Sequence, residues 1–192
     1  MPKPLEDVDR ERLVEELPAT TSPEKRDRTL VLLLLSTGAR SSDVLRLNRS
    51  DWGHERVAVV GKGDKERVVN VTTRARDGVD DYLADRTDPS PALFINFQAA
   101  SNANAKTMRA SRLTDRGARY ICTELSRRLS IPAFHPHRLR HTLGTVVQEE
   151  LGDARLTADI LGHVGLGSVA GYTQITEMGR KNAKDHIERA GL

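Results

Sequence analysis

The chain has 192 residues, of which 38% are hydrophobic, 30% charged and only 4% aromatic. This length supports one ample core, and the scarcity of aromatic residues favours a helix-rich domain over a sandwich or barrel. The longest apolar run, Leu30 to Leu35, has six residues, far below the roughly 20 that a membrane-spanning helix needs. The single cysteine, Cys122, excludes an internal disulfide. With no sign of secretion, we expect a soluble intracellular (cytoplasmic) protein.

The formal net charge of +3 is modest, but the charges are unevenly distributed. Six acidic residues crowd the first 16 positions, whereas the stretch from Lys106 to Arg140 holds nine lysines and arginines against Asp115 and Glu124. A basic segment of this kind predicts a polyanionic partner such as a nucleic acid.

The N-terminal part of the sequence predicts two helices. Apolar spacing over residues 5–17 indicates a short amphipathic helix. A second helix begins with Ser22 as its cap and Pro23 in its first turn, and it runs through the apolar block to a stop at Gly38. That block must lie in the centre of the core.

The stretch TGARSSDVLRL, Thr37 to Leu47, predicts a third, short helix. Ser41 or Ser42 can cap it, which leaves Arg40 at its N-terminal edge and Asp43 three residues further on. A surface ion pair between Arg40 and Asp43, worth about 0–1 kcal/mol, is the alternative to a functional role for this arginine.

Two β-branched runs, at 56–60 and 66–71, predict a β-hairpin. The connecting turn GKGDK displays Lys62 and Lys65 at the tip of the hairpin, where its glycines let the backbone approach a partner. A merely solvated tip is the alternative.

Three further elements lead to the basic part of the chain. We expect an amphipathic helix over residues 72–86, a short strand at 93–95 and a mobile loop at 99–108. A clear helix follows over 114–129, with Thr114 as its cap. One face of this helix carries Arg116, Arg119 and Arg127. We interpret this row as facing the phosphates of a nucleic acid, although simple solvation is the alternative.

The stretch HPHRLRHTLG contains the residues best suited to chemistry on a phosphate. The predicted buried face of this helix consists of Leu139, Leu143, Val146 and Val147. His137, Arg140 and Gly144 then share another face. A guanidinium binds a phosphate through two parallel hydrogen bonds, and a histidine can exchange a proton with the same group.

The C-terminal part predicts two more helices with a small-residue segment between them. The first spans 156–161, with His163 just beyond it, and the second spans 176–190 as a solvated tail or a docking piece. Tyr172 lies between them among Gly, Ser and Ala residues, which offer it little to pack against. This position suggests a functional tyrosine.

Taken together, these motifs resemble the tyrosine recombinases, also called the phage integrase family. The resemblance spans roughly Ser22 to Ile187 and includes the order and spacing of all the motifs. The matching motifs are TGAR ending in Arg40, GKG centred on Lys62, H-x-x-R formed by His137 and Arg140, LGH ending in His163, and Tyr172 nine residues later. Asp43 stands where members commonly carry a glutamate that braces the site.

The resemblance implies a role for each of these residues in DNA cleavage. Tyr172 is the nucleophile, and Arg40 and Arg140 hold the non-bridging phosphate oxygens and the charge that develops on them. His137 accepts the proton of the tyrosine, and Lys62 donates one to the departing 5′-oxygen. His163 hydrogen-bonds the phosphate. A 3′-phosphotyrosyl link then conserves the bond energy, so the reaction needs no ATP, no cofactor and no metal.

The resemblance also implies an architecture and partners. We expect a mainly α fold with a small antiparallel β-sheet (α+β), the tyrosine recombinase catalytic-domain fold, over residues 22–192. Residues 1–21 form a helix and connector, without the N-terminal DNA-clamping domain of the family, so DNA affinity should be weak and sensitive to salt. The partners are double-stranded DNA and further copies of the chain, forming a tetramer on paired DNA sites. The residues expected to contact DNA are Lys65, Arg112, Arg116, Arg119, Arg127 and Arg138.

Three alternatives remain open from the sequence. The chain could be a non-catalytic DNA-binding regulator that kept the fold, or a type IB topoisomerase with the same chemistry. It could also be a metal-dependent enzyme, because His135, His137 and His141 form an H-x-H-x3-H pattern. Neighbouring Arg138 and Arg140 would repel a divalent cation, which argues against the metal site.

Overall fold

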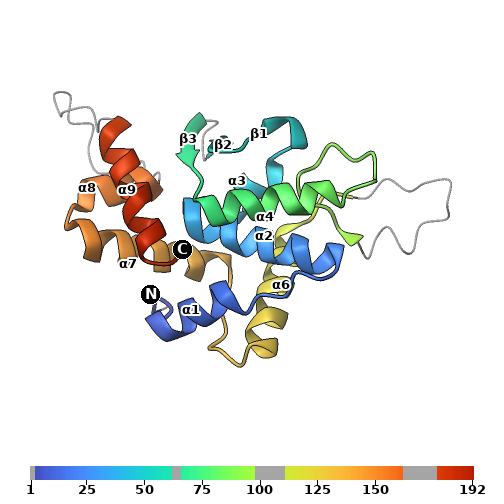
Figure 1. Ribbon diagram of the computed structural model, residues 1–192, viewed down its shortest axis with the longest axis horizontal. Helices are drawn as coiled ribbons and strands as arrows, with labels where there is room; N and C mark the ends of the chain where they lie inside the picture. The colour runs from blue at the N-terminus through green and yellow to red at the C-terminus, as the bar shows by residue number, and fades with distance from the viewer. Residues whose placement is uncertain (1–2, 62–65, 98–110, 162–176) are drawn as a thin grey trace.

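Helix α2 (Ser22–Thr37) lies at the centre of the molecule (Figure 1). The computed structural model describes residues 3–61, 66–97, 111–161 and 177–192. Every residue of the Leu30–Leu35 block is at most 2% exposed. A helix that is apolar on all sides needs cover on all sides, and α4 (Thr73–Ala84) and α7 (Pro136–Leu151) provide most of it. The sequence prediction for this block is confirmed.

The two ends of α2 are set by local chemistry. Its N-cap is Thr21 and not Ser22, because Thr21 and Glu24 form a reciprocal capping box. The helix ends at Gly38, whose φ of 58° places it in the left-handed region that favours glycine. This residue starts the turn that leads to Arg40.

The sheet has three antiparallel strands in the order β1 (Trp52–Gly53), β2 (Arg56–Val60) and β3 (Glu66–Asn70). The predicted hairpin is therefore confirmed, with a short extra strand at its edge. In its register Val57 pairs with Val69 and Val59 with Arg67. Because side chains alternate along a strand, these four residues share the face of the hairpin that turns towards the core.

Helices α3 (Ser41–Arg46) and α6 (Asp115–Arg128) pack against each other, and a 3₁₀ turn at Arg49–Asp51 follows α3. Helix α6 is capped by Thr114, as predicted. Burial raises the pKa of the Cys122 thiol on its inner face to about 12. The strand predicted at 93–95 is not formed; the described chain has only isolated bridges there, such as that between Ile95 and Arg112. The predicted loop at 99–108 lies outside the described residues.

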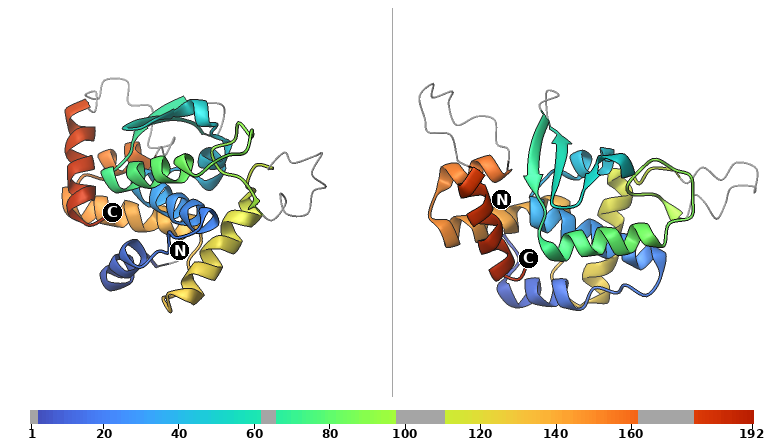
Figure 2. Two further views of the ribbon diagram at one scale, coloured as in Figure 1. Left: turned by 45° about the vertical axis from the view of Figure 1, so that its right-hand side comes forward. Right: turned by 45° about the horizontal axis from the view of Figure 1, so that its top comes forward.

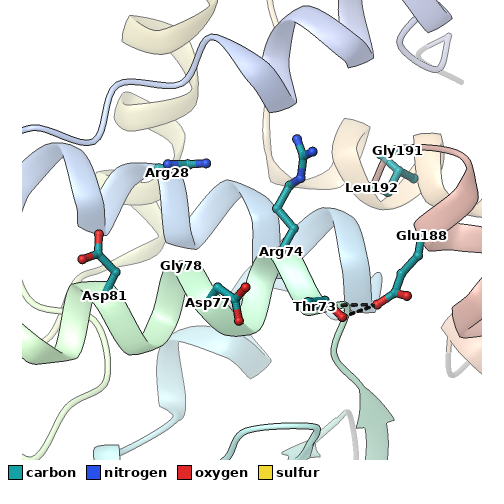
Figure 3. Close-up of a pocket in the computed structure, with 9 residues that line it drawn as sticks. All are labelled: Arg28, Thr73, Arg74, Asp77, Gly78, Asp81, Glu188, Gly191 and Leu192. Atoms are coloured by element: carbon teal, nitrogen blue, oxygen red, sulfur yellow. Dashed lines mark hydrogen bonds between the residues drawn. The ribbon is translucent and has the colours of Figure 1, made fainter.

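Helices α8 (Ala154–Leu161) and α9 (Glu177–Arg189) gather beside α7 at one end of the molecule (Figure 2). Ala183 and Ile187 on α9 are buried. The Glu188 carboxylate accepts hydrogen bonds from the backbone and side chain of Thr73, both at 2.8 Å (Figure 3). A cavity of about 480 Å³ lies beside this contact. In this structure the final helix packs on its own chain and is not a solvated tail.

The N-terminal helix α1 (Asp7–Glu15) belongs to the same hydrophobic core as the rest of the chain. Leu13 and Val14 are at most 1% exposed, and the Leu5 backbone donates a hydrogen bond to Thr142 on α7 at 3.0 Å. Among the residues described, none of the helices combines the length and apolarity needed to cross a membrane.

Candidate active site

Helix α7 brings His137 and Arg140 to one part of the molecule at different depths. The ring of His135 caps the helix by accepting the Arg138 N–H at 3.2 Å, and Pro136 occupies the first helical position. The predicted buried face of α7 is confirmed. Arg140 is also buried, with 4% of its surface exposed, whereas His137 is exposed. The helix therefore carries the buried guanidinium of Arg140 and, one turn before it, the exposed imidazole of His137.

The Arg140 guanidinium is only partly satisfied by the protein. One terminal nitrogen, Nη1, donates to the carbonyl of Gly38 at the end of α2. The other, Nη2, is buried and has no hydrogen-bond partner among the described residues. Burial and the nearby charges of Arg40 and Arg67 lower the pKa of Arg140 to about 10. An anion at this nitrogen would complete its hydrogen bonding and offset the repulsion.

Arg40 and Asp43 lie on helix α3 beside this guanidinium. Arg40 is itself the N-cap of α3, in an extended conformation and without a side-chain cap bond. The prediction that Ser41 or Ser42 caps the helix is therefore wrong, because the turn that follows Gly38 brings Arg40 to that position. Arg40 Nη1 lies 4.0 Å from Asp43 Oδ2, and Arg40 keeps 41% of its side chain exposed.

Asp43 is not half of a surface pair. Its side chain is 3% exposed, and its Oδ2 has no hydrogen-bond partner within the described part of the chain. Asp43 acts electrostatically on both Arg67 and Arg140, and with each it favours the charged arginine. A buried carboxylate among guanidinium groups partly balances their charge and limits their mutual repulsion.

Arg67 on β3 is a member of this cluster that the sequence motifs did not identify. Its Nη1 donates to the Ile160 carbonyl near the end of α8 at 3.0 Å, and its pKa is lowered by burial and, against the attraction of Asp43, by Arg40. A signal was present in the sequence, because Arg67 alternates in phase with Val69 and Val71, and both of these are buried. An arginine at a core-facing strand position indicates a polar site beneath the sheet.

We use the name arginine cluster for Arg40, Arg67 and Arg140 together with Asp43. It joins the end of α2, the start of α3, strand β3, helix α7 and the end of α8. Three positive charges against one negative charge leave a net positive site. Such a site suits an anion with several oxygen atoms, as a phosphodiester has.

Four of the predicted catalytic or DNA-binding residues belong to segments next to the cluster in the sequence. Lys62, Lys65, His163 and Tyr172 lie outside the described residues. The chain reaches them from elements that are described, since Lys62 follows β2 by two positions and His163 follows α8 by two. Their roles stay predictions.

The predicted DNA-binding arginines fall into two groups. Arg116 and Arg119 are exposed on α6, as is Arg127, which pairs with Glu124 at 2.7 Å. The other two use their guanidinium groups for internal contacts, which gives them a structural role.

Arg112 donates to the carbonyls of Leu45 and Leu47 at 2.6 and 2.7 Å. Arg138 donates to the carbonyls of Lys3, Pro4 and Ala133 at 2.7 to 3.1 Å. DNA contact by any of the five arginines stays a prediction.

The three histidines of the metal alternative do not form a ligand set. The rings of His135 and His137 stack with their centroids 6.4 Å apart, and His141 Nδ1 lies 3.4 Å from the Thr145 hydroxyl. Across the described ranges no three histidine, cysteine or carboxylate side chains are grouped so that they could hold a metal ion.

Comparison with known proteins decides the family. The sequence model of the phage integrase family matches residues 4–178. The chain belongs to this family. Its sequence is 35% identical to the tyrosine recombinase XerC of Listeria welshimeri over 155 residues, which cover 79% of this chain and 50% of that protein. It is 30% identical to tyrosine recombinase XerC of Staphylococcus aureus over 179 residues, or 92% of this chain and 58% of that protein. The chain thus spans about half the length of these relatives of the phage integrase family.

Solved structures of two recombinases have the same fold. The XerA recombinase matches with a TM-score of 0.72 and 26% identity, covering 97% of this chain and 65% of that one. The XerH site-specific recombinase bound to its difH substrate, in a pre-cleavage complex, matches with a TM-score of 0.71 and 22% identity, covering 95% and 53%. The predicted fold, mainly helical with a small antiparallel sheet, is confirmed as that of the tyrosine recombinase catalytic domain.

Proposed function

We propose that this chain is the catalytic part of a site-specific DNA recombinase that cleaves and rejoins DNA through a 3′-phosphotyrosyl intermediate. The observation that carries the proposal is the buried Nη2 of Arg140, which lies among like charges and has no partner in the described part of the chain. A phosphodiester is an anion whose two non-bridging oxygens match a pair of guanidinium groups, here Arg40 and Arg140. Membership of the phage integrase family and the resemblance to XerC support the same reaction.

In the proposed reaction the Tyr172 oxygen attacks the phosphorus atom and the bond from phosphorus to the 5′-oxygen breaks. A phenol has an ordinary pKa of about 10 and is a weak nucleophile, so it needs a base and an electrophilic phosphate. His137 accepts the phenolic proton, and its exposed position on the first turn of α7 suits a group that meets its partner at the surface. Lys62 protonates the leaving 5′-oxygen, and His163 hydrogen-bonds the phosphate.

The arginine cluster supplies electrostatic stabilisation in this scheme. Negative charge builds up on the equatorial oxygens as the fifth bond to phosphorus forms, and preorganised guanidinium groups stabilise it without rearrangement. The fork of Arg140 is already held by the Gly38 carbonyl, so little side-chain entropy is lost when the phosphate binds. Arg40, which keeps 41% of its side chain exposed, contacts the phosphate from the more exposed part of the cluster.

The partner of the site is double-stranded DNA, bound in the cytoplasm by several copies of the chain, which we expect to be a tetramer on paired sites. Arg116 and Arg119 on the exposed face of α6 would contact the DNA backbone. Such contacts release counterions, so the affinity should fall steeply with salt. Experiments with this chain therefore call for low ionic strength.

The test is a covalent-trapping assay with nicked duplexes that carry candidate sites flanking the gene. Cleavage next to the nick releases a short strand, so the protein-linked strand cannot be resealed and the adduct accumulates. We expect a slowly migrating adduct with the unmodified protein and none with Tyr172→Phe. Tyr120→Phe is the matched control, because Tyr120 is 58% exposed and is outside the proposed mechanism.

Three outcomes would contradict the proposal. An adduct that survives in Tyr172→Phe would mean that another residue is the nucleophile. DNA binding by the unmodified protein without any adduct would favour the alternative of a non-catalytic DNA-binding regulator. Loss of the adduct with EDTA would point to a metal-dependent reaction instead.

A further inference from the structure

Arg67 is the one arginine of the cluster to which the proposed mechanism assigns no contact with the phosphate. It comes from β3, 93 positions before Ile160, yet its Nη1 donates to the Ile160 carbonyl at 3.0 Å. Its Nη2 is buried, without a hydrogen-bond partner among the described residues. The side chain therefore connects the sheet to the last turn of α8.

The end of α8 is also held by an apolar contact. Leu161 is 7% exposed and packs onto Gly38 and Gly144. A Cβ atom added at Gly38 would lie 2.7 Å from Leu161 Cδ2, and one added at Gly144 would lie 2.9 Å from Leu161 Cδ1. The Leu161 side chain thus fills the space over both glycines and packs the last turn of α8 against the end of α2 and against α7.

Gly38 links the Leu161 contact to the Arg140 guanidinium, which we propose binds the phosphate. Its carbonyl accepts the hydrogen bond from Arg140 Nη1, and its Cα faces Leu161. A movement of α8 would therefore disturb the backbone that orients Arg140. Arg67 and Leu161 both hold the end of α8, and the Gly38 turn that Leu161 contacts also orients Arg140.

The charge of Arg67 also acts on the cluster directly. It is among the charges that lower the pKa of Arg140, after burial and Arg40. Asp43 attracts both guanidinium groups. Arg67 thus adds positive potential around Arg140 Nη2, where we propose that the phosphate of the DNA binds.

We propose that Arg67 is a positioning residue that holds the end of α8 against the Arg40–Arg140 pair and strengthens the field of that pair, without binding the phosphate itself. Nη1 of Arg67 is engaged by the Ile160 carbonyl of α8, and its Nη2, like that of Arg140, is buried without a partner in the described part of the chain, so the salt dependence of DNA affinity is the measurement that separates positioning from phosphate binding. The inference rests on the proposed function, because positioning has an effect on rate only if the cluster acts on DNA.

Two substitutions separate positioning from packing. Arg67→Met keeps the apolar stem but removes the charge and the donors, whereas Arg67→Lys keeps the stem, a charge and a donor. We expect Arg67→Met to slow single-turnover cleavage of the nicked duplex about 100-fold, the typical effect of a misplaced reacting group. Arg67→Lys should recover to within about 10-fold of the unmodified protein, because it restores both the charge and the contact. Equal rates in the two variants, or no loss in Arg67→Met, would overturn the proposal.

The salt dependence of DNA affinity separates positioning from phosphate binding. Each phosphate contact adds about 0.9 to the slope of log affinity against log salt concentration. Arg67→Met should leave this slope unchanged, whereas a fall of about 0.9 would make Arg67 a phosphate ligand and refute the positioning role. Arg76→Met is the matched control for the loss of one charge, because Arg76 pairs with its neighbour Asp77 on α4. It should change neither the rate nor the slope.

Hydrogen exchange gives a readout that does not depend on cleavage. Exchange of the α8 amides should be faster in Arg67→Met than in the unmodified protein, and close to normal in Arg67→Lys, with α4 unaffected in both. If the unmodified protein forms no adduct but α8 exchanges in this pattern, the proposed function fails and the anchoring by Arg67 stands. Unchanged exchange in Arg67→Met would overturn the anchoring even if cleavage were normal in the unmodified protein.

Discussion

Replacing Arg140 with methionine tests whether this residue is held in the core at an energetic disadvantage. Burial and two like charges lower its pKa from its ordinary value to about 10, and a lowering of this size corresponds to roughly 3 kcal/mol against the charged form. Methionine fits a similar volume and relieves this penalty, but it loses the hydrogen bond to Gly38, worth roughly 1.5–3 kcal/mol for a charged donor. The two effects nearly cancel, so the free energy of unfolding should change by about 1 kcal/mol or less.

Arg86 provides the matched comparison for this prediction. It is also buried, but it binds Asp88, the Tyr82 hydroxyl and the carbonyl of Leu93. Although burial opposes its charge, Asp88 and Tyr82 raise the pKa of Arg86. Arg86→Met leaves the buried Leu93 carbonyl without this donor and leaves the half-buried Asp88 carboxylate with Arg49 as its remaining ion-pair partner, at 3.1 Å, so it should lose about 3 kcal/mol.

The measurement for both variants is urea unfolding followed by the fluorescence of Trp52, the only tryptophan of the chain. Arg140→Met should also form no DNA adduct, while its stability is almost unchanged. If Arg140→Met lost as much unfolding free energy as Arg86→Met, the reasoning that Arg140 is an unsatisfied anion-binding group would be refuted.

Three further predictions follow from the contacts around the arginine cluster and helix α6. Gly144→Ala places a Cβ atom 2.9 Å from Leu161 Cδ1 and should lose about 1–2 kcal/mol of unfolding free energy. The double variant Gly144→Ala/Leu161→Ala should lose less in urea unfolding than the sum of the two single losses. Burial and then the charge of His137 lower the pKa of His135 below its ordinary 6.5. The His135 ring therefore binds a proton more readily in the unfolded chain, and the stability of the fold falls as the pH drops below about 6.5. In His135→Asn the cap does not titrate, so the drop in melting temperature between pH 7 and pH 5 should be smaller than in the unmodified protein. Arg119→Ala should lower the salt slope of DNA affinity by about 0.9 without changing the melting temperature, and an unchanged slope would remove Arg119 from the DNA interface.

The elements that follow from local physics could be read from the sequence. The Leu30–Leu35 block had to be central, because nothing polar interrupts it, and Gly38 had to end its helix. The hairpin at 56–60 and 66–70 followed from two β-branched runs and a glycine-rich turn. The family motifs in turn predicted which residues would be brought together, although they are far apart in the chain.

Other features depend on contacts between distant segments, and here local patterns were insufficient. Asp43 had the sequence context of an exposed pair, but the packing around α3 buries it. The polar helix α9 gave little indication that Glu188 would bind Thr73 at the start of α4.

The sequence by itself determined the helices, the hairpin, the family and the residue types available for phosphate chemistry, because these depend on neighbours within a few positions and on spaced motifs. Only the tertiary structure decided the depth and the pairing of each charge. His137 and Arg140 are three residues apart on one helix, yet one is exposed and the other is buried against Gly38. The reason is that burial is set by whatever packs across from a side chain, and for Arg140 and Arg67 those neighbours come from α2, α3 and α8.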